Sequence, residues 1–173
     1  CNIGYYSHSA LEAGAEYVIG YDSDINAIEL AFKRAQLQTI PFLPLYLDAT
    51  NPSPSQGWLQ SERQGFDQRN RVDMVIALAF EHHLAIGKNI PLDQVIGWIT
   101  SIAPKGLIEF VPKSDKTIGQ LLALKEDMFD DYSEDRFTKV LSSHASIVGK
   151  TKVSASGRVI YEYIDRLSKC ASY

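Results

Sequence analysis

The chain has 173 residues, of which 45% are hydrophobic and 22% are charged, and its net charge is −4. This length and composition are those of one globular domain with room for a hydrophobic core. The acidic balance gives no reason to expect a nucleic-acid partner, and no apolar run approaches the roughly 18 residues of a membrane span. Cys1 and Cys170 lie at opposite ends without metal-ligand spacing, so we expect no metal site and a reducing, cytoplasmic location.

The first part of the chain alternates helix and strand patterns. A short helix is predicted over residues 5–13, ending at Gly14, and the apolar run AEYVIGYD predicts a buried strand. SDINAIELAFKRAQ predicts a helix capped by Ser23 or Asp24. Its expected apolar face consists of Ile25, Ile28, Phe32 and Ala35. PFLPLYLD predicts an edge strand, because Pro44 cannot donate a ladder hydrogen bond.

The rest of the chain continues the alternation and closes with a hairpin. The polar stretch 49–71 predicts a surface excursion with one helical turn around Trp58. Strands are predicted in VDMVIALAF and GLIEFV. Helices are predicted in PLDQVIGWITSIAP, in SDKTIGQLLALKEDMF with Ser114 as cap, and in SEDRFTKVLSSH with Ser133 as cap. ASIVGKTKV and RVIYEYI, joined by SASG, predict an antiparallel hairpin.

This order of elements predicts an α/β fold with a doubly wound sheet. Strand–helix–strand alternation implies right-handed crossovers. Ligands of such sheets bind beyond the carboxyl ends of the strands. The residues to consider are therefore those at the predicted strand ends: 1–4, Asp22, Asp48, 77–83 and 109–113.

Gly4 and Asp22 have the spacing of a site for an adenosine-containing cofactor. A glycine turn before a helix lets a ligand approach the backbone, and an acid about 20 residues later can accept both ribose hydroxyls. In the alternative interpretation, both residues have only structural roles: Gly4 is a turn residue and Asp22 caps the following helix. No further glycine follows, and Tyr5 and Tyr6 stand where a pyrophosphate would need open backbone. A cofactor without phosphates is therefore favoured over NAD.

The opening CNIG resembles the end of the D-x-G-C-N-x-G loop of class I S-adenosylmethionine-dependent methyltransferases. The resemblance covers nearly the whole chain and implies a Rossmann-like methyltransferase domain over 1–165, followed by a tail at 166–173. It also implies that the D-x-G and the first strand belong to an upstream part of a longer parent chain. More narrowly, IEFVPKSD and KEDMFDDYS resemble bacterial methyltransferases related to the nodulation protein NoeA.

The resemblance implies a cofactor, S-adenosylmethionine, and a set of residues that bind it. Asp22 would hold the ribose, Asp48 would meet the adenine amino group, and the turn at Gly4 would hold the methionine part. The implied cofactor-binding residues are Asn2, Gly4, Tyr5, Asp22, Ser23, Asp48, Ala49 and Ala79.

The segment EHH follows the strand VDMVIALAF and would lie over the reaction centre. Direct displacement needs alignment of acceptor and methyl group rather than a covalent nucleophile. His82 or His83 could take the proton of a hydroxyl acceptor as catalytic base, or both could be packing and surface residues. Candidate substrate contacts are Glu81, Glu109 and Lys113, although Glu109 and Lys113 are also interpretable as a surface pair. The chain lacks the Asn-Pro-Pro-aromatic tetrad of many nitrogen methyltransferases, which favours a small-molecule acceptor.

Two other functions remain open at this point. An NAD-dependent oxidoreductase would share the alternating sheet but leaves the terminal hairpin unexplained. A methyltransferase-like module that has lost catalysis and serves in binding would share every feature of the fold, and only cofactor binding and turnover distinguish it. The methyl acceptor and the oligomeric state do not follow from the sequence.

Overall fold

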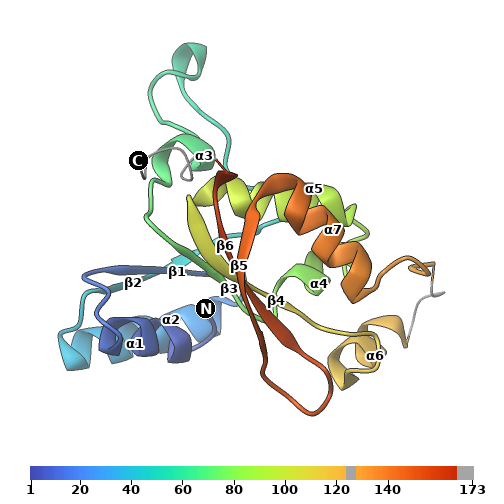
Figure 1. Ribbon diagram of the computed structural model, residues 1–173. Coiled ribbons are helices and arrows are strands. Elements are labelled where there is room, and N and C mark those ends of the chain that lie inside the picture. The colour runs from blue at the N-terminus through green and yellow to red at the C-terminus, as the bar shows by residue number, and fades with distance from the viewer. Residues whose placement is uncertain (124–127, 167–173) are drawn as a thin grey trace, which may run out of the picture. The chain divides into compact units, whose positions relative to one another are not determined.

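The computed structural model describes residues 1–123 and 128–166. The chain divides into two compact units, Cys1–Pro54 and Ser55–Tyr173, coloured blue to cyan and cyan to red in Figure 1. The strands pair within the units, as a two-stranded sheet in the first and a four-stranded sheet in the second. Parallel strand pairs that alternate with helices in the chain agree with the predicted α/β class. Among the described residues, no helix is both long enough and apolar enough to cross a membrane.

The first unit is built around a parallel strand pair. Its elements are α1 (Tyr5–Glu12), β1 (Val18–Asp22), α2 (Ile25–Gln38) and β2 (Phe42–Tyr46). In the register of the pair, β1 begins opposite the start of β2 and ends opposite its end. Parallel pairing therefore brings the residues that follow both strands to one edge of this sheet.

The buried face of α2 differs from the predicted one. The helix begins after Asp24, whose carboxylate accepts the first backbone N–H groups and makes this residue, rather than Ser23, the cap. Its buried residues are Ala27, Ala31 and Ala35. Phe32, expected in the core, is 45% exposed. The small alanines let the helix lie close to Phe42 of β2, which packs in the same cluster.

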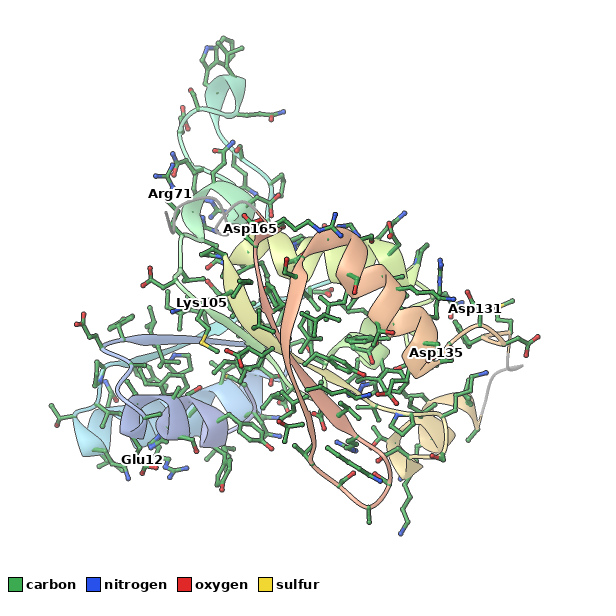
Figure 2. The ribbon with its side chains drawn as sticks, in the orientation of Figure 1. Glu12, Arg71, Lys105, Asp131, Asp135 and Asp165 are labelled. Carbon is green, nitrogen blue, oxygen red and sulfur yellow. The ribbon has the colours of Figure 1, made fainter. Side chains whose placement is uncertain are left out.

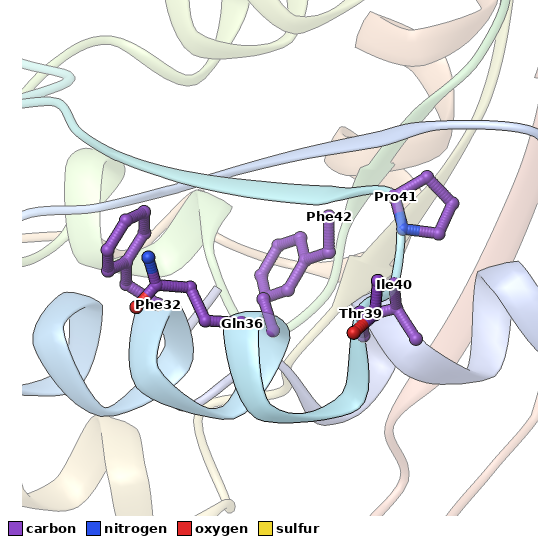
Figure 3. Close-up of a pocket in the computed structure, with 7 residues that line it drawn as sticks. Phe32, Gln36, Thr39, Ile40, Pro41 and Phe42 are labelled. Atoms are coloured by element: carbon purple, nitrogen blue, oxygen red, sulfur yellow. The ribbon is translucent and has the colours of Figure 1, made fainter.

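An open hollow lies between α2 and the start of β2. Phe32, Gln36, Thr39, Ile40, Pro41 and Phe42 line it, together with Ala35 (Figure 3). Because Phe42 is the first residue of β2, the hollow lies at the amino end of the strand. The candidate cofactor residues Asp22 and Asp48 lie at the carboxyl end, so the hollow is not part of that site.

The second unit begins with the polar excursion and contains the larger sheet. The helical turn predicted around Trp58 is confirmed as η1 (Trp58–Gln60), and α3 (Phe66–Arg69) follows it. The remaining elements are β3 (Val75–Ala77), α4 (Glu81–Ala85), α5 (Leu92–Ile102), β4 (Lys105–Phe110), α6 (Lys116–Leu122), α7 (Glu134–His144), β5 (Ser146–Lys152) and β6 (Val159–Ile164). The last eight residues, predicted as a tail, lie outside the described residues except for Arg166.

The four-stranded sheet has the order β3-β4-β6-β5. β3 and β4 are parallel, whereas β6 runs antiparallel to both β4 and β5. The predicted antiparallel hairpin is thus confirmed. A bulge between Ile147 and Gly149 interrupts the β5–β6 register.

Two helices form the core of the second unit with this sheet. α5 and α7 lie side by side on it (Figure 1). The predicted apolar face of α5 is buried at Val95, Ile96 and Ile99. On α7, Phe137 packs against two rings of the sheet in a tilted arrangement, with centroids 5.4 Å from Phe110 and 5.3 Å from Tyr161. These aromatic contacts join α7 to β4 and β6 of the sheet.

The helix caps of this unit agree only partly with prediction. Ser133 caps α7, as expected, by accepting the backbone N–H of Arg136 at 3.2 Å. Asp131 and Asp135 lie at the exposed N-terminal end of this helix (Figure 2), where negative charge is favourable. α6 is capped by Asp115 rather than by the predicted Ser114. Part of the predicted continuation of α6, residues 124–127, lies outside the described residues.

We predict that Gly20→Ala destabilises the first unit. A Cβ atom at this position of β1 would lie 2.7 Å from the ring of Phe42 and 2.8 Å from the Cβ of Cys1. Overpacking of this kind costs about 1–3 kcal/mol of unfolding free energy. Urea denaturation measures the loss. Gly119→Ala in α6 is the matched control, because its Cβ meets no atom within 4 Å and alanine favours a helix interior. Equal midpoints for the two variants would contradict the packing argument.

Candidate functional site

Asp22 closes β1 and holds the N-terminal turn. Its Oδ2 accepts the backbone N–H of Asn2 at 2.6 Å and lies 2.8 Å from the backbone nitrogen of Cys1, while Oδ1 accepts the N–H of Asp24 at 3.0 Å. Burial raises the pKa of this carboxyl, but the hydrogen bonds from the backbone N–H groups of Asp24 and Asn2 lower it. A carboxylate has about four acceptor positions, so the ionised side chain, 25% exposed, can accept a further hydroxyl.

The turn before α1 has the left-handed backbone that its glycine suggested. Asn2 and Gly4 have φ values of 49° and 87°, and the N–H of Gly4 donates to the carbonyl of Cys1 at 3.0 Å. A Cβ on Gly4 would lie 2.6 Å from the ring of Phe42. Glycine is therefore required here both by conformation and by space. Tyr5, directly after the turn, is exposed.

Asp48 follows β2 and lies at the same sheet edge as Asp22. Its Oδ1 accepts the backbone N–H and the hydroxyl of Thr50, at 2.9 and 2.7 Å. The N–H of Leu47 donates to the carbonyl of Asp22 at 2.9 Å, which joins the two strand ends. The parallel pair thus brings Asp22 and Asp48 together, with Ala49 half-buried beside Asp48 and Ser23 exposed after Asp22.

In the second unit, the backbone of Ala79 is hydrogen-bonded to the side chain of Glu109. Ala79 follows β3 and has a left-handed φ of 48°, and its backbone N–H donates to Glu109 Oε2 at 2.6 Å. Glu109, near the end of β4, is 6% exposed, so the interpretation of this side chain as a surface charge is wrong. Lys113, its predicted companion, is half-buried after the strand.

The cation beside Glu109 is Arg158, at the start of β6. Its Nη1 lies 3.5 Å from Glu109 Oε1. The same guanidinium donates from Nε and Nη2 to the two oxygens of Asp115, at 2.7 and 2.9 Å. Hydrogen bonds from Arg158 hold the pKa of Asp115 well below its usual range. Sequence reasoning missed both residues, because they are far apart in the chain and belong to no recognisable motif.

Glu81, the first residue of α4, is fully buried. Tyr132 places its hydroxyl 2.5 Å from Glu81 Oε1 and 2.9 Å from the carbonyl of Val111. One phenolic proton cannot serve both acceptors, but both bonds are satisfied if the carboxyl is protonated and donates to the phenol. Burial raises the pKa of Glu81 to about 8, against the opposing hydrogen bonds of Tyr132 and Val111. This carboxyl is therefore neutral at pH 7.

The two histidines of α4 have different surroundings. His82 is fully buried, and neither ring nitrogen has a hydrogen-bond partner among the described residues. Burial, followed by the charges of His83 and Arg158, lowers the pKa of His82 to about 4. The ring of His83 lies 4.4 Å from it, centroid to centroid, and His83 is exposed. Within the described part of the chain, no three His, Cys, Asp or Glu side chains are grouped to hold a metal ion.

We predict that Glu81→Gln changes the pH dependence of stability. Glu81 has a pKa of about 8 when folded and an ordinary value of 4.5, so the folded state binds the extra proton between these pH values. Its contribution to stability therefore falls as pH rises from 4.5 to 8, by up to about 1.4 kcal/mol per pH unit. Glutamine is neutral throughout and removes this dependence.

Urea unfolding of both proteins across this pH range tests the prediction. The comparison with Glu81→Gln is essential, because His82 also changes its charge in part of this range. The pKa of His82 is lowered from 6.5 to about 4, so its contribution to stability rises with pH between these two values. Glu12→Gln, an exposed glutamate of α1 (Figure 2), is the matched control. Parallel stability curves for wild type and Glu81→Gln would show that Glu81 is not protonated in the folded state.

Comparison with known proteins links the chain to one curated relative. No protein-family profile matches it. Nodulation protein NoeA of Rhizobium meliloti (strain 1021) is 53% identical over 163 residues, which cover 94% of this chain and 34% of NoeA. The chain therefore spans about one third of the length of this relative.

Solved structures share the fold at low sequence identity. The PH0226 protein of Pyrococcus horikoshii OT3 has a TM-score of 0.65 at 15% identity, covering 96% of this chain and 79% of its own. An S-adenosylmethionine-dependent methyltransferase of Clostridium acetobutylicum ATCC 824 has a TM-score of 0.65 at 10% identity, covering 95% and 80%. The 16S rRNA methyltransferase RmtF, in complex with S-adenosyl-L-homocysteine, has a TM-score of 0.61 at 14% identity, covering 94% and 53%.

Likeness at these identities establishes the fold, while the identity to NoeA establishes homology. The chain is a homologue of part of nodulation protein NoeA and has the Rossmann-like fold of the class I S-adenosylmethionine-dependent methyltransferases.

Proposed function

We propose that this chain binds S-adenosylmethionine and transfers its methyl group to a small-molecule acceptor. The observation that carries the proposal is the edge of the β1–β2 pair. There an ionised Asp22 and an adjacent Asp48 follow parallel strands, and the Asn2–Gly4 turn is bonded to Asp22. An acid in this position accepts the hydroxyls of a ribose.

In this proposal the first unit supplies the cofactor contacts. Asp22 and Ser23 hold the ribose, and Asp48 and Ala49 hold the adenine. The left-handed turn presents backbone groups of Asn2, Gly4 and Tyr5 to the methionine part. The antiparallel β6, which lies between β4 and β5, supports this cofactor over NAD, because that strand distinguishes the methyltransferase sheet.

The acceptor side of the proposal rests on the residues that follow β3 and β4. S-adenosylmethionine carries an activated methyl group when bound, so the protein has to orient the acceptor and remove its proton. His83 is the better candidate base, because its ring is exposed while that of His82 is buried. Lys113 follows β4, where the acceptor would be oriented, whereas Ala79, which follows β3, is kept as a cofactor contact.

An RNA acceptor is the second candidate. RmtF, which shares the fold, is a 16S rRNA methyltransferase, and this does not fit the expectation that no nucleic acid takes part. The net charge of −4 supports the small-molecule acceptor, because neutralisation of phosphates by Lys and Arg dominates nucleic-acid affinity.

We expect Asp22→Asn to weaken binding of S-adenosylhomocysteine by about ten- to a hundred-fold in the intact protein, since a hydrogen bond to a charged group contributes about 1.5–3 kcal/mol. Calorimetry measures the affinity. Asp24→Asn is the matched control, because it removes the neighbouring acid while asparagine caps α2 equally well. Equal affinities for folded Asp22→Asn and wild type would refute the ribose assignment.

We expect His83→Ala to lower methyl transfer by about 10²–10⁴-fold without weakening cofactor binding, as loss of a general base does. Transfer from labelled S-adenosylmethionine is measured with a small-molecule cell fraction and, separately, with 16S rRNA. His144→Ala on α7 is the control, because this exposed histidine contacts Asp93 rather than α4. If only the rRNA is labelled, the acceptor is RNA rather than a small molecule. Cofactor binding without label on either substrate would favour an inactive binding module.

A further inference from the structure

The backbone at Ala79 is held in a conformation that needs support. A left-handed backbone at a residue with a Cβ atom is unfavourable and persists where surrounding contacts impose it. Here the φ of Ala79 is 48°, and its N–H donates to Glu109 Oε2 at 2.6 Å. Because Glu109 is buried, water competes little for this charge-assisted bond. Glu109 therefore fixes the turn directly after β3.

Glu109 is in turn held by Arg158. A buried carboxylate needs a cation, and the guanidinium lies 3.5 Å from its Oε1. Arg158 cannot rotate freely, because both oxygens of Asp115 accept from it in a planar fork. Asp115 also accepts the N–H of Thr117 at 3.0 Å and the hydroxyl of Ser156 at 2.7 Å.

These contacts form one continuous chain inside the second unit. It starts at the N-terminus of α6 with Asp115, passes through Arg158, directly before β6, and Glu109 of β4, and ends at the amide of Ala79. Each link is charged or charge-assisted, and both carboxylates, those of Asp115 and Glu109, are nearly inaccessible to solvent. Loss of Arg158 would leave Glu109 buried without its cation, which weakens its hold on Ala79.

We propose that Arg158 and Asp115 are positioning residues that act through Glu109 to fix the Ala79 turn for methyl transfer. The inference makes Glu109 a support of the backbone rather than a substrate contact. The role of the turn in methyl transfer rests on the proposed function. The hydrogen bond by which Glu109 fixes the turn does not depend on any ligand.

The first measurement is amide hydrogen exchange at Ala79 in the intact protein, by NMR. Arg158→Met and Glu109→Ala should each speed exchange at Ala79 by about ten- to a hundred-fold, the range of one hydrogen bond to a charged group. Glu109→Gln keeps an oxygen acceptor and Arg158→Lys keeps the charge, so each should restore part of the protection. Exchange at Ile108 of β4, a buried strand residue, should not change.

Lys150→Met is the matched control. Lys150 is a cation of the same hairpin and lies 2.8 Å from Glu134, outside the chain of contacts to Ala79. This variant should leave exchange at Ala79 unchanged. Unchanged exchange in both Arg158→Met and Asp115→Asn would overturn the proposal.

The second measurement is affinity for S-adenosylhomocysteine by calorimetry, well below the unfolding temperature. Arg158→Met should weaken binding about ten-fold, and Arg158→Lys should recover part of it. If exchange at Ala79 accelerates and affinity stays the same, the turn does not serve the cofactor, and the functional half of the inference fails. If the wild type does not bind the probe at all, the proposed function fails, while faster exchange in the variants would still establish the hold on the turn.

Discussion

The geometry of the second unit depends on how it accommodates buried carboxyl groups. A carboxylate withdrawn from water must either find a cation or take up a proton. Glu109 has the guanidinium of Arg158 beside it, whereas Glu81 lies against the hydroxyl of Tyr132 and has its pKa raised to about 8. Both pairings join elements that are distant in sequence. Glu109 holds the loop after β3 through its hydrogen bond to Ala79, and Glu81 joins α4 to Tyr132.

The acid of the first unit has different surroundings. Asp22 is partly exposed and accepts the backbone N–H groups of Asn2 and Asp24, so its charge is stabilised while acceptor capacity remains. This arrangement suits a neutral hydroxyl ligand such as ribose. The fold is that of the methyltransferases, but a shared fold does not establish a shared reaction, and the proposed activity therefore depends on these side chains.

Much of the local structure followed from residue patterns, and the errors have physical causes. The period of the apolar residues located α5 correctly, because its large side chains are also its buried ones. In α2 the same rule succeeded only in part. Ala35 is buried as predicted and Ile28 is half-buried, but Ile25 and Phe32 are exposed. The alanines of this helix are buried in the cluster of Phe42, since close packing selects small side chains. The cap of α6 was misplaced by one residue, because Ser114 and Asp115 are both good caps and only the fold selects between them.

The sequence by itself determined the α/β class, the closing hairpin, the glycine turn and the acids after the first two strands. Each of these is a local pattern or follows from parallel strand order. Only the tertiary structure decided that Glu109 bonds to Ala79 and Arg158, that Asp115 orients Arg158, and that Tyr132 holds a neutral Glu81. These partners are brought together by packing between elements remote in the chain, and burial, which no single residue type encodes, keeps Glu81 neutral.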